Sequence, residues 1–378
     1  MRSLFLGATL AVAWVPTAMA GNEADNDWLE LDSQLGGLGG PAAYQGSGVD
    51  VGVLIRPAYV DSSDFPNVDG EKFGGFVLDD ARLFASGNYG QFDWRLSMDF
   101  AEGAGGLPVE AGPPPDGQTF QAELLDAYAR WQFSDAFGVQ IGQFNSRDAF
   151  SGDVYQGRLL FADRSIVGRQ FNEFDLGLQI DGSYGNQEYP ELEWALSVLN
   201  GNDGPEDDLD LRARIDINAL GNGGSVTEGA YGVENEANGT FGLFWGSDGD
   251  VDGAGSSGTI WGADYRGNYG PFGLGVEYFD FDDDAALAAD FGMDSAQVLG
   301  AYASYLFGAE QNWEAGVRWE DVDSAMGPTR WTVGLNYYVS GHDIKWQLNW
   351  VDTDSDVAAA KGSYLKLGLT IGMSAEAN

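Results

Sequence analysis

Residues 92–100 read FDWRLSMDF, and this stretch decides the fold. Phe92, Trp94, Leu96, Met98 and Phe100 are apolar, whereas the residues between them are Asp, Arg or Ser. In an extended chain successive side chains point to opposite sides, so this alternation gives a β-strand with one apolar and one polar face. The sequence therefore predicts a strand whose two faces meet different surroundings.

The same alternation recurs along most of the chain. Residues 343–350 read DIKWQLNW, and residues 364–373 read YLKLGLTIGM. Counting such runs predicts sixteen strands. They lie at 48–60, 74–87, 91–101, 121–133, 137–144, 173–183, 190–199, 208–219, 239–246, 258–267, 271–281, 295–307, 311–321, 329–339, 342–352 and 362–373.

The connections between these runs alternate between short and long. Short ones such as 88–90, 267–270 and 340–341 contain Gly or Asn, which adopt the positive φ of tight turns. The long connections include 102–118, 145–172 and 220–238. An even number of strands about 10 residues long, joined in this way, is typical of outer-membrane barrels. We therefore expect an all-β protein, a single transmembrane antiparallel β-barrel of about sixteen strands.

A soluble β-sandwich also alternates apolar and polar faces, because its apolar faces meet in a core. Three features favour the barrel instead. Trp and Tyr are frequent near the ends of the apolar faces, the opposite faces carry Gly and charges of both signs, and the chain begins like an exported protein.

The amino terminus resembles an export signal. Met1–Ser3 carries a positive charge, residues 4–15 are apolar, and residues 18–20 read Ala-Met-Ala, a small-residue cleavage pattern. We therefore expect a signal peptide at 1–20, a flexible, Gly-rich, acidic periplasmic start at 21–46, and a barrel domain at 47–378.

The composition excludes several functions. The formal charge of −41 opposes binding to nucleic acid, because phosphate repels an acidic surface. With no Cys and a single His, the chain has no thiol nucleophile and no His cluster for a metal. His342 falls at a predicted turn, where we expect a surface residue. We therefore expect no catalytic residue, no metal site and no cofactor.

The basic residues are mostly Arg, and on the predicted strands they fall on the polar faces. One interpretation is that they form ion pairs with carboxylates such as Asp93, Asp99, Asp126, Asp216 and Glu320. The other is a track for anions, because a guanidinium group offers forked donors to phosphate-like groups. The candidate pore-lining residues are Arg82, Arg95, Arg130, Arg212, Arg214, Arg266 and Arg318 on strands, and Arg147, Arg158, Arg164 and Arg169 in the connection 145–172.

Several short motifs, in order along the chain, resemble the phosphate-selective porin O and P family of Gram-negative outer membranes. They are LDDARL at 78–83, WRLSMDF at 94–100, LDAYARW at 125–131, IGQF at 141–144, DRS at 163–165, LGLQ at 176–179, VLNG at 198–201, YGPF at 269–272, GVEY at 275–278 and VGLNYY at 333–338.

The resemblance implies a homotrimeric, sixteen-stranded porin whose third extracellular loop, here 145–172, folds inward to constrict the pore. Arg82, Arg95, Arg130 and Arg164 lie in matching stretches, so it carries a pore-lining role to them. The implied function is passive diffusion of small hydrophilic solutes or ions, with anions such as phosphate among the candidates. The partners would be outer-membrane lipid and lipopolysaccharide.

Two other functions stay open from the sequence. A barrel with a plugged lumen would act as an enzyme or adhesin and would not conduct ions. A secreted soluble β-sandwich would be extracted without detergent.

Overall fold

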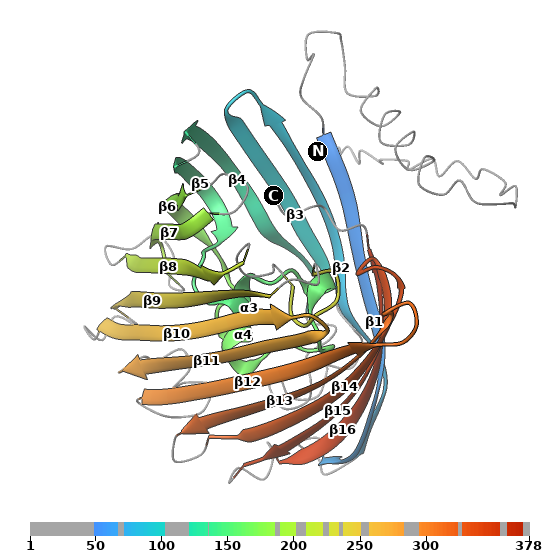
Figure 1. The fold of residues 1–378 in the computed structure, drawn as a ribbon. Helices are drawn as coiled ribbons and strands as arrows, with labels where there is room; N and C mark the ends of the chain where they lie inside the picture. The colour runs from blue at the N-terminus through green and yellow to red at the C-terminus, as the bar shows by residue number, and fades with distance from the viewer. Residues whose placement is uncertain are drawn as a thin grey trace, which may run out of the picture. The chain divides into compact units, whose positions relative to one another are not determined.

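The fold is taken from a computed structural model (Figure 1). It describes residues 49–66, 72–102, 121–134, 136–185, 190–201, 209–221, 227–233, 237–250, 257–282, 295–323, 327–355 and 361–372. The predicted signal peptide and the predicted periplasmic start lie outside the described residues.

Sixteen strands form, as the alternation predicts. They are β1 (Val49–Pro66), β2 (Lys72–Tyr89), β3 (Phe92–Glu102), β4 (Gln121–Ser134), β5 (Phe137–Asn145), β6 (Phe174–Gly185), β7 (Pro190–Leu199), β8 (Asp210–Leu220), β9 (Asn238–Asp250), β10 (Ser257–Tyr269), β11 (Phe272–Asp282), β12 (Ser295–Phe307), β13 (Trp313–Asp323), β14 (Thr329–Ser340), β15 (Ile344–Asp354) and β16 (Gly362–Gly372).

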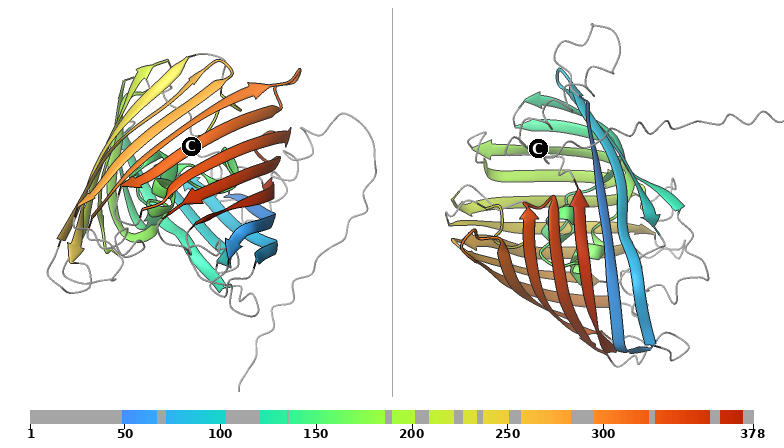
Figure 2. Two further views of the ribbon diagram at one scale, coloured as in Figure 1. Left: turned by 90° about the horizontal axis from the view of Figure 1, so that it is seen from below. Right: turned by 90° about the vertical axis from the view of Figure 1, so that its right-hand side faces the viewer.

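The strands close into a single barrel. Each pairs antiparallel with its neighbours in sequence, and β1 pairs with β16 to complete the ring (Figure 2). A sandwich would leave two separate sheets, so the closed ring excludes that alternative and confirms the predicted barrel.

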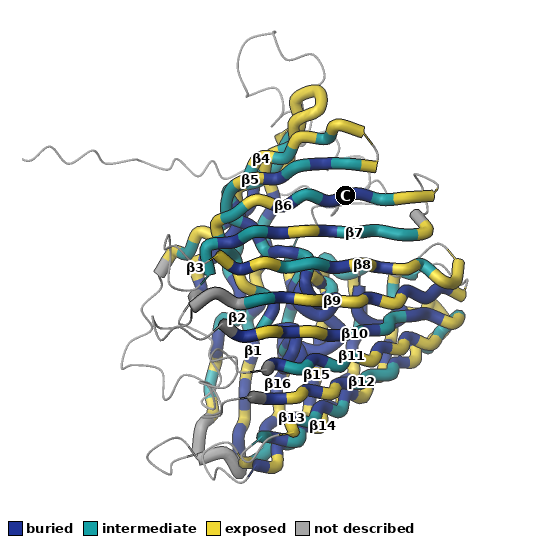
Figure 3. The backbone as a smooth tube through the Cα atoms, turned by 90° about the vertical axis from the view of Figure 1, so that its left-hand side faces the viewer, coloured by how far each residue is buried: buried dark blue, intermediate teal, exposed yellow. Residues whose placement is uncertain are grey.

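The two faces of the wall are the reverse of those in a soluble protein. On β15, Trp346 exposes 44% of its surface, whereas Lys345 exposes none and Gln347 only 1%. The same alternation of exposed and buried residues continues from strand to strand (Figure 3). Apolar side chains outside and polar side chains inside are what a barrel in a lipid bilayer requires.

Aromatic pairs mark two levels on the outer face. On β13 and β14, the rings of Trp313 and Tyr337 lie 4.6 Å apart, and those of Trp319 and Trp331 lie 6.5 Å apart. The two pairs sit six residues apart along each strand. Such bands are expected where the wall meets the two membrane interfaces.

The connections define two ends of the barrel. Because neighbouring strands are antiparallel, the even-numbered strands all finish at one end, called here the turn end, and the odd-numbered strands finish at the other, the loop end. Gly90, Gly270 and Gly341 have φ of 65°, 60° and 55° in the short turns at the turn end. Only glycine adopts this left-handed conformation freely, so these turns confirm the sequence prediction.

Pro57 introduces a local irregularity in the wall. Arg56 pairs in register with Asp80, but Pro57 pairs with Leu78, which leaves Asp79 as an extra residue in β2. Proline lacks the N–H that a regular ladder needs, so a bulge at this point is expected. As a result, two consecutive carboxylates contact cations of the inner face: Asp79 contacts Lys366, and Asp80 contacts Arg56 and Arg82.

The connection between β5 and β6, residues 146–173, is called here the inward loop. It contains three short helices, α3 (Phe150–Asp153), η1 (Gln156–Arg158) and α4 (Ile166–Gln170). They lie inside the ring of strands (Figures 1 and 2). Among the described residues, no helix has both the length and the hydropathy that crossing a membrane demands.

Candidate functional site on the inner face of the barrel

The middle of the inward loop is an apolar stretch that lies against the barrel wall. Residues 159–162, Leu-Leu-Phe-Ala, each expose 3% of their surface or less. Gly316 and Gly334, which are cross-strand neighbours, leave room for this stretch. A Cβ atom added to Gly334 would lie 3.0 Å from the ring of Phe161. Because these glycines carry no side chain, the inner face is recessed at this point, and the loop packs into the recess.

Side chains of the wall donate hydrogen bonds to the carbonyl groups of this stretch. Asn336 donates to the carbonyl of Leu160 at 2.7 Å. Arg318 donates to the carbonyls of Asp163 and Arg164 at 3.1 and 3.2 Å. Further donors are Arg56 to Ala162, and Lys345 and Gln347 to Leu159. Because buried carbonyl groups need donors, the wall cations hold the loop in place.

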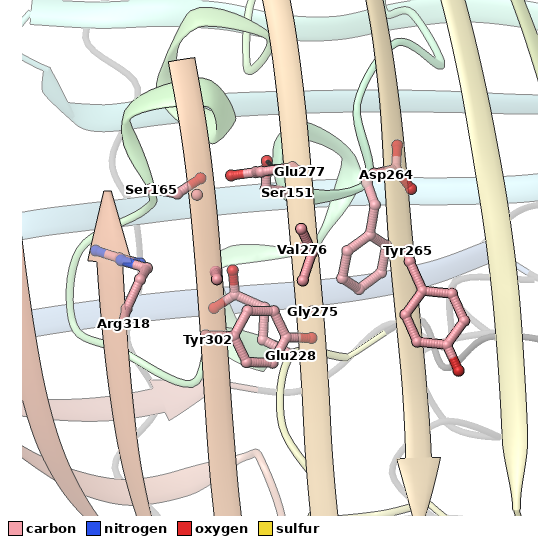
Figure 4. A pocket seen from close by; sticks show the side chains of 13 residues that line it. Ser151, Ser165, Glu228, Asp264, Tyr265, Gly275, Val276, Glu277, Tyr302 and Arg318 are labelled. Atoms are coloured by element: carbon pink, nitrogen blue, oxygen red, sulfur yellow. Dashed lines mark hydrogen bonds between the residues drawn. The ribbon is translucent and has the colours of Figure 1, made fainter. Parts of the chain in front are cut away.

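Carboxylates of the wall accept from the loop in return. The amide of Ile166 donates to Glu320, and the hydroxyl of Ser151 donates to Glu277 at 2.6 Å. Figure 4 shows Glu277 beside Ser151, in a cavity of about 20 Å³ that Arg318 also lines. Such a space holds about one water molecule. It is therefore a packing site between loop and wall and not a pocket for a solute.

An aromatic cluster fixes the second half of the inward loop. The ring of Phe171 lies 5.2, 4.9 and 5.8 Å from those of Phe244, Phe279 and Phe281. Together with Ile166 and Val167 of α4, these rings are buried on the inner face. With the contacts of Arg56 to Ala162 and of Arg212 to Asp148, the inward loop is thus attached to β1, β8, β9, β11 and β13–β16.

Among the arginines with ion pairs between described residues, the most exposed lie on β3 and β4 and at the start of the inward loop. The side chains of Arg95 on β3, Arg130 on β4 and Arg147 at the start of the inward loop expose 23%, 24% and 31%. Each has a carboxylate partner. Arg95 contacts Asp126 at 2.9 Å, and Arg130 contacts Asp181 at 2.7 Å.

Arg82 and Arg95 use only part of their guanidinium groups in these pairs. Nε of Arg82 lies 2.9 Å from both Asp80 and Asp99, and Nε of Arg95 is the atom that meets Asp126. Among the described residues, the hydrogen bonds that the two side chains donate to carboxylates come from Nε. The guanidinium of Arg95 also lies over the ring of Phe84, with its central carbon 5.4 Å from the ring centroid.

Four other predicted arginines are held closely by carboxylates. Arg214 has a side-chain exposure of 2% and lies 2.7 Å from Asp216 and from Asp264. Arg318, equally buried, lies 3.0 Å from Glu320. Arg212 and Arg266 are paired as well, with Asp148 and Asp210 and with Asp216 and Asp264 respectively. These side chains connect strands to one another or to the inward loop.

The inward loop carries the remaining predicted arginines, Arg158, Arg164 and Arg169. Arg164 is buried and donates to the carbonyls of Ser151 and Val154. Burial and the neighbouring charge of Arg82 lower the pKa of Arg164 to about 9, against the opposing effect of Glu228. This guanidinium remains charged at neutral pH, but its donors serve the loop itself.

The two interpretations of the arginines therefore apply to different residues. Asp99, Asp126, Asp216 and Glu320 have arginine partners, as the ion-pair interpretation predicts. Asp93 has no such partner among the described residues. Among the described residues, Arg95 and Arg130 keep solvent contact beside their carboxylate partners.

Several residues that hold the inward loop lie outside the predicted pore-lining set. Lys345 and Lys366 are almost fully buried on the inner face and contact the inward loop. Glu277 accepts a hydrogen bond from the hydroxyl of Ser151 in the loop, and Glu320 accepts one from the amide of Ile166. Lys345 and Lys366 alternate with exposed apolar residues, and the ion-pair interpretation already names Glu320, so strand periodicity signals these positions. Glu228 lies in the connection 220–238, where no periodicity signals its role.

His342 is not the free surface residue that we expected from its position at a turn. Its Nε2 lies 3.2 Å from the carbonyl of Tyr231, and its ring packs edge-on against those of Tyr231 and Tyr338. The connection 220–238 places Tyr231 there, and turn propensities give no sign of such a tertiary contact. Burial, with the nearby charge of Lys345, lowers the pKa of His342 to about 3.

Comparison with known proteins agrees with the barrel fold described above. The family model of phosphate-selective porin O and P matches residues 58–373, more than half of the chain. A search of curated proteins finds no match.

Solved structures of outer-membrane channels have the same fold. The outer membrane channel DcaP of Acinetobacter baumannii is 12% identical, with a TM-score of 0.58 over 88% of this chain and 99% of that one. Pseudomonas putida OprB at low pH is 10% identical, with a TM-score of 0.57 over 92% and 97%. Pseudomonas aeruginosa OpdK with vanillate is 13% identical, with a TM-score of 0.51 over 86% and 98%. At these identities the likeness shows the fold alone.

Proposed function

The chain belongs to the phosphate-selective porin O and P family of outer-membrane porins, and on this premise we propose that it conducts small hydrophilic anions by passive diffusion past Arg95 and Arg130. The inward loop contacts the inner face from β8 through β16 to β1 and β2. Solutes would then pass along the side formed by β3–β7, where Arg95 and Arg130 keep solvent contact.

The observation that carries this proposal is the arrangement at Arg95. Its Nε contacts Asp126 at 2.9 Å, and its side chain keeps 23% of its surface exposed. A channel must bind a solute well enough to admit it and weakly enough to release it. An arginine that is half engaged by a carboxylate meets both conditions, because it offers donors without a large net charge.

A reversal-potential measurement tests the anion preference. We would compare the wild type with Arg95→Gln and Arg130→Gln in planar bilayers under a salt gradient. The control is Lys361→Gln, which removes a positive charge that is 61% exposed near the loop end. We expect wild-type anion preference, a reduced preference in the two arginine variants, and none of this reduction in the control.

Two outcomes would refute the proposal. A cation-selective wild type that Arg95→Gln leaves unchanged would mean that the arginines do not guide solutes. A folded barrel with no conductance would instead favour the plugged enzyme or adhesin. In the proposed transport no bond is broken, so no residue is assigned a catalytic role.

Export and assembly of the chain can also be tested. We infer that residues 1–20 are removed before Gly21, which amino-terminal sequencing of the membrane-inserted protein would test. The family resemblance supports a homotrimer in contact with lipopolysaccharide. Native electrophoresis before and after heating would test the trimer, and a monomer under all mild conditions would contradict it.

A further inference from the structure

A second segment enters the barrel from the end opposite the inward loop. Residues 227–233, called here the inward turn, belong to the connection between β8 and β9, which lies at the turn end. Thr227, Glu228 and Ala230 expose 7%, 2% and 1% of their surface. An ordinary turn at a membrane surface would be exposed, so this segment has a place inside the wall.

The inward turn is attached to the inner face by its backbone. The amide of Ala230 donates to Glu314 at 2.6 Å, and Asn268 donates to the carbonyl of Gly229 at 2.6 Å. Gly229 has φ of +87°, and a Cβ atom on Gly273 would lie 2.6 Å from its carbonyl carbon. Glycine is therefore needed on both sides of the contact.

Aromatic residues fix the other half of the segment. The ring of Tyr231 stacks on that of Tyr338 with centroids 3.7 Å apart. The hydroxyl of Tyr338 donates to Glu314 at 2.6 Å, so the carboxylate that holds Ala230 also orients the ring beneath Tyr231. Cooperative contacts of this kind position a segment more firmly than single hydrogen bonds do.

The inward turn meets the inward loop at Glu228. The amide of Leu160 donates to the Glu228 carboxylate at 3.0 Å, and the amide of Glu228 donates to the carbonyl of Arg158 at 3.3 Å. This two-way contact joins connections from opposite ends of the barrel. Burial raises the pKa of Glu228, although the charges of Arg318, Arg164 and Lys345 oppose the shift.

We propose that the inward turn is a second constriction element and that Glu228 is the positioning residue that holds the inward loop against it, so that the pair sets the width of the solute path. This inference rests on the proposed channel function. Without Glu228, the amide of Leu160 would lose its acceptor, and the loop would be held by its contacts with the wall alone.

Single-channel conductance and exclusion of neutral polymers test this role. We would compare the wild type with Glu228→Ala, Glu228→Gln and the control Glu310→Gln, which removes an exposed charge from the same end. We expect Glu228→Ala to raise the conductance and to admit larger polymers. Glu228→Gln should retain the wild-type width, because its amide oxygen still accepts from Leu160. The control should match the wild type.

The results separate this inference from the channel function itself. A conducting wild type whose conductance and exclusion size survive Glu228→Ala would overturn the positioning role alone. A wild type that does not conduct would instead refute the channel function.

A labelling experiment keeps the inference testable if Glu228→Ala fails to fold. The chain has no Cys, so a single Ala230→Cys can be probed with a membrane-impermeant maleimide in the otherwise wild-type barrel. The reference is Ser340→Cys, an exposed position at the turn end. We expect Ala230→Cys to react much more slowly. Equal rates would show that the inward turn is not seated in the lumen.

Discussion

The ammonium group of Lys366 lies 2.7 Å from the carboxylate of Asp163, although the two residues are 203 positions apart in the sequence. The same ammonium lies 2.8 Å from Asp79, the extra residue of the β2 bulge. One buried cation therefore joins the last strand, an early strand and the inward loop. A defect at this point should affect both the closure of the barrel and the seating of the loop.

Replacement of Lys366 should destabilise the protein strongly. Lys366→Met leaves two carboxylates without their partner on the inner face, and loss of one member of a buried ion pair costs about 3–5 kcal/mol. Urea unfolding in detergent, followed by heat-modifiable electrophoresis, measures the change. Lys361→Met, which breaks an exposed pair with Asp354, should cost less than about 1 kcal/mol. Equal losses in the two variants would contradict the assignment.

Asp163 should make stability depend on pH in strong acid. Burial alone would raise its pKa, but Lys366 outweighs burial and lowers the pKa of Asp163 to about 2. The folded state therefore binds this proton less readily than the unfolded state. Its contribution, about 2 kcal/mol, is present above pH 4 and is lost as the pH falls towards 2. Asp163→Asn should flatten the unfolding free energy across this window, and an unchanged slope would exclude this carboxylate as the cause.

His342 should make stability depend on pH in a higher range than Asp163 does. Its pKa is near 3 in the folded protein and near 6.5 when unfolded, so the unfolded state binds the proton first on acidification. Stability should decline as the pH falls from about 6.5 towards 3. In His342→Gln, which cannot titrate, this part of the decline should disappear from unfolding curves recorded at pH 7, 5 and 4. Parallel curves for variant and wild type would disprove the effect.

Two glycines of the inner face should respond differently to the same substitution. A Cβ atom on Gly334 would lie 3.0 Å from the Phe161 ring, whereas on Gly368 the nearest atom, Cβ of Ala162, would be 3.8 Å away. Gly334→Ala should therefore displace the inward loop and cost about 1–3 kcal/mol. Gly368→Ala meets only ordinary van der Waals contact and should be tolerated. Unfolding free energies and single-channel conductance of the two variants provide the comparison.

Phe171 should hold the second half of the inward loop. Phe171→Ala removes the ring at the centre of the cluster with Phe244, Phe279 and Phe281, at a cost of about 3–5 kcal/mol. The barrel itself should remain closed, because its strand pairs are untouched. Hydrogen exchange should therefore increase in α4 and leave β9 and β11 protected. Equal increases in the loop and in these strands would point to general unfolding.

Alternation of residue types alone determined the strands and their faces. The runs predicted at 190–199 and 295–307 coincide with β7 and β12, and the resemblance predicted that 145–172 folds inward. Errors occur where the alternation fades: β1 continues to Pro66 and β9 to Asp250, beyond the predicted ends at 60 and 246. There, pairing with the neighbouring strand extends the ladder through polar residues.

Only the tertiary structure decided how the lumen is divided. Alternation is a local property, because it reports the side to which each side chain points but not what lies opposite. Strand register decides which carboxylates contact Lys366 and Arg214. The path of the connections decides that Phe161 packs on Gly334 and that residues 227–233 lie inside the barrel. Contacts between residues distant in sequence decide these features. For that reason the sequence predicts both Arg95 and Arg214 as pore-lining residues, whereas in the folded barrel Arg95 keeps solvent contact and Arg214 is buried between carboxylates.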